Sequence, residues 1–359
     1  MFKKTIIIII SVLFVAMLIS PWLSLILPKK FRDHTYNFLV YKIIADRETY
    51  GLKDKKSITY ALFNYVRNSI FTPAGLSPYE AKPIVYLINA TGYCDYNVQV
   101  FTALLAGKNI PARYAFLKDK DGISPHTMAE VYIRGKWRLI DPASGLIFIK
   151  NNELATIEDV SDNPNLIFMH PKLQAIKVIN EEEFNGITEW YSRMFPVPQE
   201  PQRSSSKIKR ITIFDRITNL YWYIFKNKFI RTYQDLYLKA ANQGFKSTAE
   251  IKIYTARNYN LTYRIEEAVR IYKQVINEFP NSNYAEDSLF FLSLANINYK
   301  KDYKEGLKTI NQLLLKFPES RWKRIAVYYL YFCNKKISNI EVANKYYLQS
   351  HWELLDIPY

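Results

Sequence analysis

At 359 residues, with 49 lysines and arginines against 33 acidic residues and a formal net charge of +16, the chain is longer than one ordinary domain. Because 49% of its residues are hydrophobic and glycine and proline are sparse, a disordered or low-complexity polypeptide is excluded. The lysines are spread along the chain and no groove-reading motif accompanies them, so we predict no nucleic-acid binding. The sequence therefore predicts two folded units with buried cores.

The N-terminal segment 5–27 is a nearly uninterrupted apolar run, long enough for the roughly 20 helical residues that cross a bilayer. A signal peptide is the alternative, but no small-residue cleavage site follows and Pro21 is poorly placed for cutting. We predict an uncleaved N-terminal transmembrane helix and a membrane-anchored, single-pass protein. Lysines on both sides of the run leave its orientation open, and we expect an extracytoplasmic (periplasmic) soluble portion.

The next part of the chain predicts helices followed by a strand meander. Residues 57–70 carry apolar side chains at helical spacing, and a second helical pattern begins at Cys94, directly after Thr91-Gly92-Tyr93. From 127 to 139 the pattern alternates with period two and is interrupted at Arg134-Gly135, which predicts two strands joined by a tight hairpin. Helices followed by strands indicate an α+β domain.

A polar segment with Pro196, Pro198, Pro201 and Ser204 predicts a linker. Residues 211–237 carry apolar side chains at helical spacing, interrupted by charged residues that are mostly basic. This pattern predicts a basic amphipathic helix that packs on protein or lies on a bilayer surface. The predicted organisation is a membrane anchor at 1–30, the first domain at 31–195, the linker and amphipathic helix at 196–247, and an all-α domain at 248–359.

The C-terminal third contains an internal repeat. Residues 266–282 recur as 304–320, and in each copy a helical pattern ends at Phe-Pro, at Phe279-Pro280 and Phe317-Pro318. A further helical pattern lies between the copies, so each unit is a helix pair that buries its apolar face by stacking on its neighbours. The pattern resembles tetratricopeptide repeats of bacterial envelope proteins, with weaker flanking copies near 248–263 and 341–355. The alternative is an ordinary helical bundle.

Two cysteines, Cys94 and Cys333, cannot build a disulfide framework or a cysteine zinc site. A thiol at a helix N-terminus is favoured as the thiolate, the form that attacks carbonyl carbon, and Gly92 permits the close backbone approach that such a nucleophile needs. Two alternatives remain. Cys94 is a buried apolar residue, or it forms a disulfide with Cys333.

The hairpin predicts a partner for the thiol. If Arg134-Gly135 is a two-residue loop, His126 becomes the same-face diagonal neighbour of Asp141, within roughly 7–8 Å. Asp141 can then orient the imidazole of His126, which acts as the base for Cys94. A register slip of one residue would place the two on opposite faces of the sheet, and Asp141-Pro142 alone is also typical of a turn that ends a strand.

These residues resemble the transglutaminase-like superfamily over about 53–164. The resemblance rests on four motifs in series: Gly92-Tyr93-Cys94, then Ile110-Pro111-Ala112-Arg113, then His126-Thr127-Met128-Ala129-Glu130, then Gly135-Lys136-Trp137 leading to Asp141-Pro142. It implies a papain-like fold with Cys94 as nucleophile, His126 as general base and acid, and Asp141 as the residue that holds His126. No calcium loop of the EF-hand sort is visible, so we predict no metal site, and we predict no cofactor. Met128 replaces a common Trp and Asn109 a usual Gly.

The first functional hypothesis is a cysteine peptidase or amidase, or a transglutaminase-like acyl transferase, that acts on peptide or amide bonds through an acyl-thioester on Cys94. Hydrolysis is the expected outcome rather than cross-linking. The expected partners are a peptide or protein substrate, a protein bound by the helical repeats, and a membrane contacted by the N-terminal helix. The second hypothesis is a catalytically inactive envelope scaffold that binds partners through the repeats. A third is a module that binds anionic lipid through the basic helix.

Overall fold

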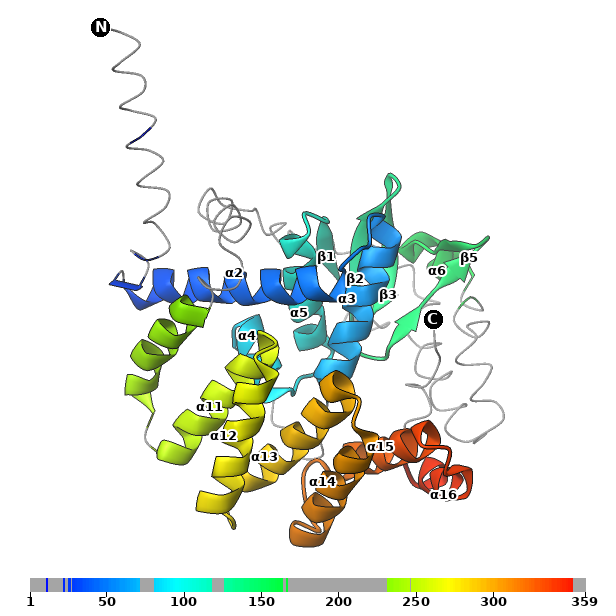
Figure 1. Cartoon of the computed structure of the whole chain (residues 1–359). Coiled ribbons are helices and arrows are strands. Elements are labelled where there is room, and N and C mark those ends of the chain that lie inside the picture. Colours follow the sequence, from blue (N-terminus) through cyan, green and yellow to red (C-terminus); the bar gives the residue numbers. More distant parts are fainter. Residues whose placement is uncertain are drawn as a thin grey trace, which may run out of the picture.

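The computed structural model describes residues 28–71, 81–117, 126–163, 166, 231–245 and 247–350, together with 11, 22, 25 and 26. Within these residues a mixed helix-and-strand domain is followed by a region of stacked helices (Figure 1). The predicted linker and residues 211–230 of the predicted amphipathic helix lie outside the described residues, whereas 231–241 are helical.

The first domain places four helices before an antiparallel sheet. The helices are α2 (Lys29–Glu48), α3 (Lys55–Ser69), α4 (Pro83–Asn89) and α5 (Cys94–Gly107). The four-stranded sheet has the order β1 (Ala112–Leu117), β2 (His126–Ile133), β3 (Lys136–Asp141) and β4 (Leu146–Ile147). A small second sheet pairs β5 (Ile149–Lys150) with β6 (Glu153–Leu154), and α6 (Ile157–Asp162) follows.

Helix α3 shows why this region folds as the sequence predicts. Asp54 caps its N-terminus by accepting a hydrogen bond from the Ser57 backbone N–H, and the apolar residues at three- and four-residue steps form its buried face. Leu62 and Val66 on that face are fully buried in the domain core. Helix α5 crosses the same core and packs against β1, β2 and the three preceding helices, so its N-terminus is held from several sides.

The hairpin has the predicted register. Arg134 and Gly135 both adopt positive φ, 50° and 78°, as a two-residue turn of the primed type requires, and Ile133 pairs with Lys136. Where the superfamily resemblance leads us to expect a glycine, Asn109 has φ 57°, a left-handed conformation that asparagine tolerates better than most residues. That departure from the family pattern leaves the turn before β1 intact.

The C-terminal region is a series of antiparallel helices. They are α11 (Thr248–Leu261), α12 (Ile265–Glu278), α13 (Asn283–Leu294), α14 (Tyr303–Lys316), α15 (Lys323–Lys336) and α16 (Ile340–Ser350). The short 3₁₀ helix η1 (Asn242–Gly244) precedes them, and α13 continues as the π-helical segment η2 (Ala295–Lys300). Consecutive helices pack on each other, and α12 and α14 each end directly before Phe-Pro, as the repeat predicts.

Trp322 is the centre of the repeat core. It is fully buried, and its indole stacks on Phe290 with ring centroids 4.3 Å apart. Its Nε1–H donates to Asp287 at 2.7 Å. Nη2 of Arg321 donates to both oxygens of the same carboxylate, each at 2.7 Å. The residue that fills the core is therefore also hydrogen-bonded, which is the usual condition for burying an indole.

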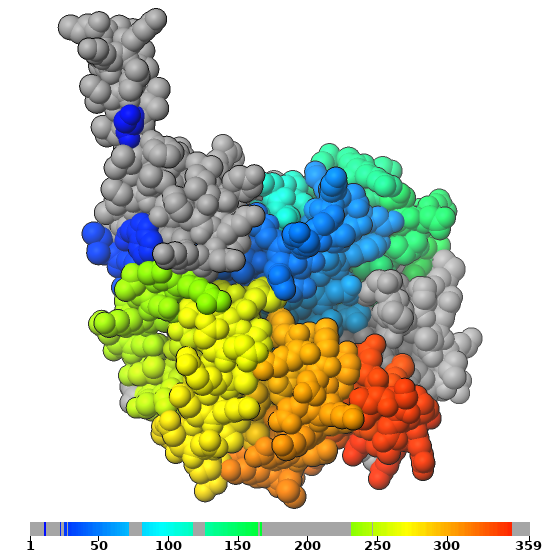
Figure 2. All heavy atoms as spheres, in the orientation of Figure 1, coloured from blue at the N-terminus to red at the C-terminus, as the bar shows by residue number. Residues whose placement is uncertain are grey.

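The helical region lies directly against the first domain, and the surfaces of the two meet across a broad front in Figure 2. Tyr36 of α2 is buried, stacks on Tyr237 at 3.7 Å and donates its hydroxyl to Asn258 Oδ1 of α11 at 2.8 Å. Phe71, which follows α3, packs in the repeat core with its ring 5.9 Å from that of Phe290. Buried aromatic and amide contacts of this kind fix the two parts relative to each other.

The predicted membrane-anchored localisation is wrong. Among the residues that the structure describes, no helix combines the length and the apolar character needed to cross a bilayer. Most of the predicted span, 5–27, lies outside those residues. The described helix that follows, α2, has the charged residues Lys29, Lys30, Arg32 and Asp33 in its first turns. Its apolar residues are buried in the protein core, so this helix packs on protein.

Gly306 provides a test of the repeat packing. A Cβ at this position in α14 would lie 2.5 Å from Cγ1 of the buried Ile297 in η2. Alanine normally stabilises a helix interior by about 1 kcal/mol relative to glycine, but overpacking costs about 1–3 kcal/mol. We therefore expect Gly306→Ala to lower the free energy of unfolding, measured by denaturant titration. The control is Gly107→Ala, where the new Cβ meets its nearest neighbour at an ordinary 3.6 Å and should be tolerated. Stabilisation by Gly306→Ala would contradict the packing.

Candidate active site

Cys94 occupies the first position of α5 and is partly exposed. Tyr93 precedes it in an extended conformation, so the sulfur lies where the backbone N–H groups of the first turn are not used within the helix. Both cysteines are free thiols, and Cys333 is buried in the repeat core. The alternative of a disulfide between Cys94 and Cys333 is therefore excluded, and a partly accessible thiol lies at a helix N-terminus.

The segment before Cys94 is held by backbone pairing with the end of α3. Phe71 and Thr91 form a parallel bridge, in which the Phe71 N–H donates to Ala90 at 2.9 Å and the Gly92 N–H donates to Phe71 at 2.9 Å. A Cβ on Gly92 would lie 2.9 Å from Cβ of Tyr96, too close for any side chain. The predicted need for glycine before the nucleophile thus has a steric cause, the tight approach of this loop to the first turn of α5.

His126 and Asp141 meet across the β2–β3 hairpin. His126 Nε2 lies 2.8 Å from Asp141 Oδ2, and both side chains are buried, with exposed fractions of 4% and 0%. The other carboxylate oxygen, Oδ1, accepts hydrogen bonds from the backbone N–H groups of Ala143 and Ser144 at 3.1 and 3.0 Å. Both oxygens of the carboxylate are therefore held by hydrogen bonds. Because Nε2 of the imidazole is bonded to the carboxylate, Nδ1 is the ring nitrogen left to face the thiol.

Electrostatics favour the thiolate of Cys94 and the protonated form of His126. Burial of the sulfur opposes its ionisation, but the hydrogen bond and positive charge of His126, with a hydrogen bond from the Thr127 backbone, outweigh burial and lower the pKa of Cys94. Burial also opposes the charge on His126, yet the Asp141 carboxylate and the Cys94 sulfur raise the pKa of the imidazole well above its usual range. The structure thus brings all three sequence-predicted residues together as a coupled chain of charges.

Arg257 of α11 binds the last turn of α4, the helix that leads into the segment before Cys94. This buried guanidinium donates from Nε to the Ile88 carbonyl and from Nη2 to the Leu87 carbonyl, both at 2.7 Å, and lies over the Phe291 ring at 3.8 Å. Leu87 and Ile88 lie in the last turn of α4, which ends at Asn89, and the chain then runs directly into the segment that precedes Cys94. The last carbonyls of α4 are thus satisfied by a side chain from the other part of the molecule.

The sequence offered no signal for two of these contributors. Arg257 binds backbone carbonyls, which carry no sequence identity, and the Thr127 N–H belongs to a residue that was assigned only to a strand. Within the described residues no group of three or more histidine, cysteine or acidic side chains is arranged to hold a metal ion.

Residues 42–142 match the model of the transglutaminase-like superfamily, and residues 253–282 match that of the tetratricopeptide repeat. The chain carries a transglutaminase-like core domain followed by a tetratricopeptide repeat. The transglutaminase-like match spans Cys94, the hairpin and Asp141 and ends one residue beyond Asp141. Both resemblances predicted from the sequence are thereby confirmed.

Among solved structures, a candidate cysteine protease from Cytophaga hutchinsonii is similar at 20% identity, with a TM-score of 0.26. The match covers 33% of this chain and 38% of that one, so this chain spans well under half of that protein. No curated protein matches the sequence significantly.

The thiolate predicts alkylation at low pH. Because the pKa of Cys94 is lowered by His126, iodoacetamide should label Cys94 at pH values well below the free-thiol value of about 8.5, and labelling should fade only as the pH falls through the lowered pKa. In His126→Ala the labelling profile should shift to higher pH. Mass spectrometry of the digested protein measures the labelling rate at each cysteine, and the buried Cys333 serves as an internal reference. Equal labelling rates at the two cysteines would contradict the site.

The hydrogen bonds of Arg257 to α4 predict that substitution of this residue lowers stability. Lysine keeps the charge but cannot donate in the two-pronged geometry, so Arg257→Lys should lose one charged hydrogen bond and lower the free energy of unfolding by about 2 kcal/mol. Arg270→Lys, at an exposed position of α12, is the matched control and should change stability by less than about 0.5 kcal/mol. Equal effects in guanidinium unfolding of both variants would refute the role of Arg257.

Proposed function

We propose that the protein is a cysteine hydrolase of peptide or amide bonds, with Cys94 as nucleophile, His126 as general acid and base, and Asp141 as the group that orients His126. The observation that carries the proposal is the buried hydrogen bond between His126 and Asp141 beside a thiol of lowered pKa. A nucleophile, a base and an orienting carboxylate in this order form the minimal set for covalent acyl transfer.

In the first half-reaction the Cys94 thiolate attacks the carbonyl carbon and forms a C–S bond. The carbonyl oxygen becomes an oxyanion, and the backbone N–H of Cys94, at the first position of α5, is a suitable donor to it. When the C–N bond breaks, the imidazolium of His126 gives its proton to the leaving amine. The products are a free amine, a neutral imidazole and an acyl-thioester on Cys94.

In the second half-reaction His126 takes a proton from water, and the resulting hydroxide attacks the thioester. The C–S bond then breaks, the acid is released, and the thiolate–imidazolium pair is restored. An amine in place of water would yield a new amide. Hydrolysis is the proposed outcome because Cys94 is partly exposed and water therefore reaches the thioester without a dedicated binding site.

The helical repeats supply the second part of the proposal, a surface that binds a protein partner or a protein substrate. Tetratricopeptide repeats present helix faces built for such contacts. Because Arg257 of the repeats binds the last turn of α4, which leads into the segment before Cys94, a protein bound to the repeats would be held near the reacting thiol.

Asp141→Asn tests the proposed roles directly. The amide keeps the shape of the side chain but removes the charge that favours the imidazolium, so hydrolysis of peptide or amide substrates should fall about 10²- to 10⁴-fold. Turnover is measured on a panel of fluorogenic peptides and on unfolded protein, and the acyl-enzyme is sought by mass spectrometry of wild type at short times.

Two comparisons complete that experiment. Cys94→Ala should abolish both turnover and the acyl adduct, whereas Cys333→Ala should leave both unchanged. A fluorescent primary amine added to the reaction distinguishes the two fates of the thioester, because its incorporation into product would indicate transfer. An acyl adduct that persists without turnover in all conditions would reject hydrolysis.

A further inference from the structure

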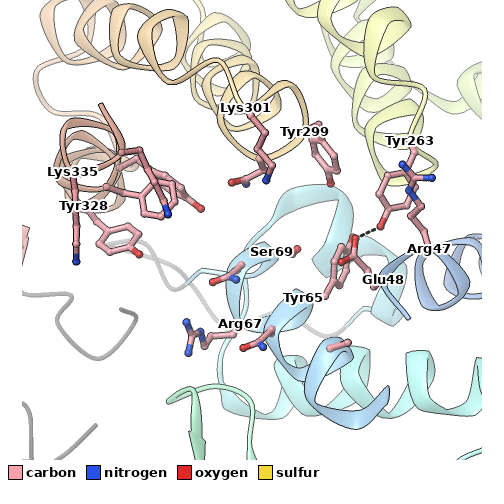
Figure 3. Close-up of a pocket in the computed structure, with 17 residues that line it drawn as sticks. Arg47, Glu48, Tyr65, Arg67, Ser69, Tyr263, Tyr299, Lys301, Tyr328 and Lys335 are labelled. Atoms are coloured by element: carbon pink, nitrogen blue, oxygen red, sulfur yellow. Dashed lines mark hydrogen bonds between the residues drawn. The ribbon is translucent and has the colours of Figure 1, made fainter. Parts of the chain in front are cut away.

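A cavity lies at the junction of the two parts of the molecule, away from Cys94, His126 and Asp141. Its volume is about 980 Å³, within the range of small-molecule sites, and none of Cys94, His126 and Asp141 lines it. Figure 3 shows Tyr263 and Arg47 on one side of it and Tyr328 and Lys335 on the other. The end of α3, with Arg67 and Tyr65, forms the floor in this view, and Lys301 projects from the end of η2.

The charge of this cavity is strongly one-sided. Five of the 17 lining residues are lysine or arginine, twice the fraction of 49 in 359 for the whole chain: Arg47, Arg67, Lys301, Lys335 and Lys336. Glu48 is the one carboxylate among the described lining residues, and it already accepts a hydrogen bond from the Tyr263 hydroxyl. Like charges gathered in a partly enclosed site create a positive potential that attracts anions.

Burial gives the cavity a defined interior and rim. Arg67, Tyr65 and Tyr329 have exposed fractions of 7%, 7% and 5%, whereas Lys301 and Lys336 are exposed. A guanidinium held in a partly desolvated position binds phosphate with two parallel hydrogen bonds, and the rim lysines add point charges that adjust to a ligand.

The walls are aromatic on both sides. Tyr263 meets Tyr299 edge to face at 5.6 Å, and Tyr328 meets Tyr329 in the same manner at 5.3 Å. Asn64, Asn68 and Asn298 supply amide groups between them. Aromatic faces and amides are the groups that hold a planar, hydrogen-bonding ring.

We propose that this junction cavity binds a nucleotide-sized organic phosphate, with the phosphate groups at Arg67 and the lysines and the planar ring against the tyrosines. Lys335 also donates to the Tyr331 hydroxyl at 2.7 Å, and a multiply charged phosphate suits the five cations of this lining better than a single carboxylate does. The ligand contacts both parts of the molecule, so it stabilises their association. This site is independent of the activity proposed for Cys94.

Isothermal titration calorimetry of the full chain at low salt tests the proposal with three probes. ATP carries both ring and phosphates, tripolyphosphate carries only the charge, and adenosine carries only the ring. We expect saturable binding of one ATP per chain, weaker binding of tripolyphosphate and no saturation by adenosine. ATP affinity should fall as the salt concentration rises.

Matched charge variants separate a built site from the overall basic charge. Lys301→Glu/Lys336→Glu reverses two rim charges, and Lys304→Glu/Lys316→Glu reverses two exposed lysines outside the cavity, so both variants change the net charge equally. The rim variant should weaken ATP binding by about tenfold or more, and the control by less than about threefold. Arg67→Met should abolish binding, with circular dichroism as the check on folding.

Equal losses in the rim variant and the control would overturn the proposal, because binding would then follow net charge alone. Absence of saturable ATP and tripolyphosphate binding to wild type would overturn it as well. Saturation by adenosine with an affinity equal to that of ATP would remove the role of the cations. Each readout is a binding isotherm, so none of these outcomes depends on the fate of peptide substrates at Cys94.

Discussion

The register of β2 against β3 is the constraint on which the candidate active site depends. The side chains of a strand alternate between the two faces of the sheet, so a slip of one residue would place His126 and Asp141 on opposite faces. The two-residue turn at Arg134 and Gly135 fixes that register, and two backbone N–H groups beyond β3 then hold the carboxylate. Once the buried carboxylate is in place, it stabilises the imidazolium, and the imidazolium in turn stabilises the thiolate of Cys94.

Cys94 is positioned by long-range contacts as well as by its own helix. The bridge between Phe71 and Thr91 aligns the loop before α5, and Phe71 is itself buried in the core of the helical repeats. Arg257 binds the carbonyls at the end of α4, a few residues upstream. The transglutaminase-like domain therefore shares part of its core with the repeats beside the segment that precedes Cys94.

Much of this arrangement could be predicted from short patterns in the sequence. The apolar spacing of α3, the helix that starts at Cys94, the Arg134-Gly135 hairpin and the Phe-Pro ends of α12 and α14 are encoded within a few residues, so each could be predicted. Arg257 and the junction cavity could not, because they arise from contacts between distant segments and, for Arg257, with backbone atoms. The membrane-anchored localisation failed because it rested on the length of one apolar run, whereas the described helices lack a span.

The central claim is that Cys94 and His126 exist as a thiolate–imidazolium pair supported by Asp141. The protonation state of the His126 ring, followed by NMR of protein with isotope-labelled histidine, tests this most directly, with His126→Gln to assign the signal. The account predicts that both ring nitrogens of His126 carry protons at neutral pH and that Cys94→Ala lowers the pKa of the ring, since the sulfur contributes to raising it. A neutral imidazole at pH 7, unchanged by Cys94→Ala, would contradict the pair and with it the proposed nucleophile.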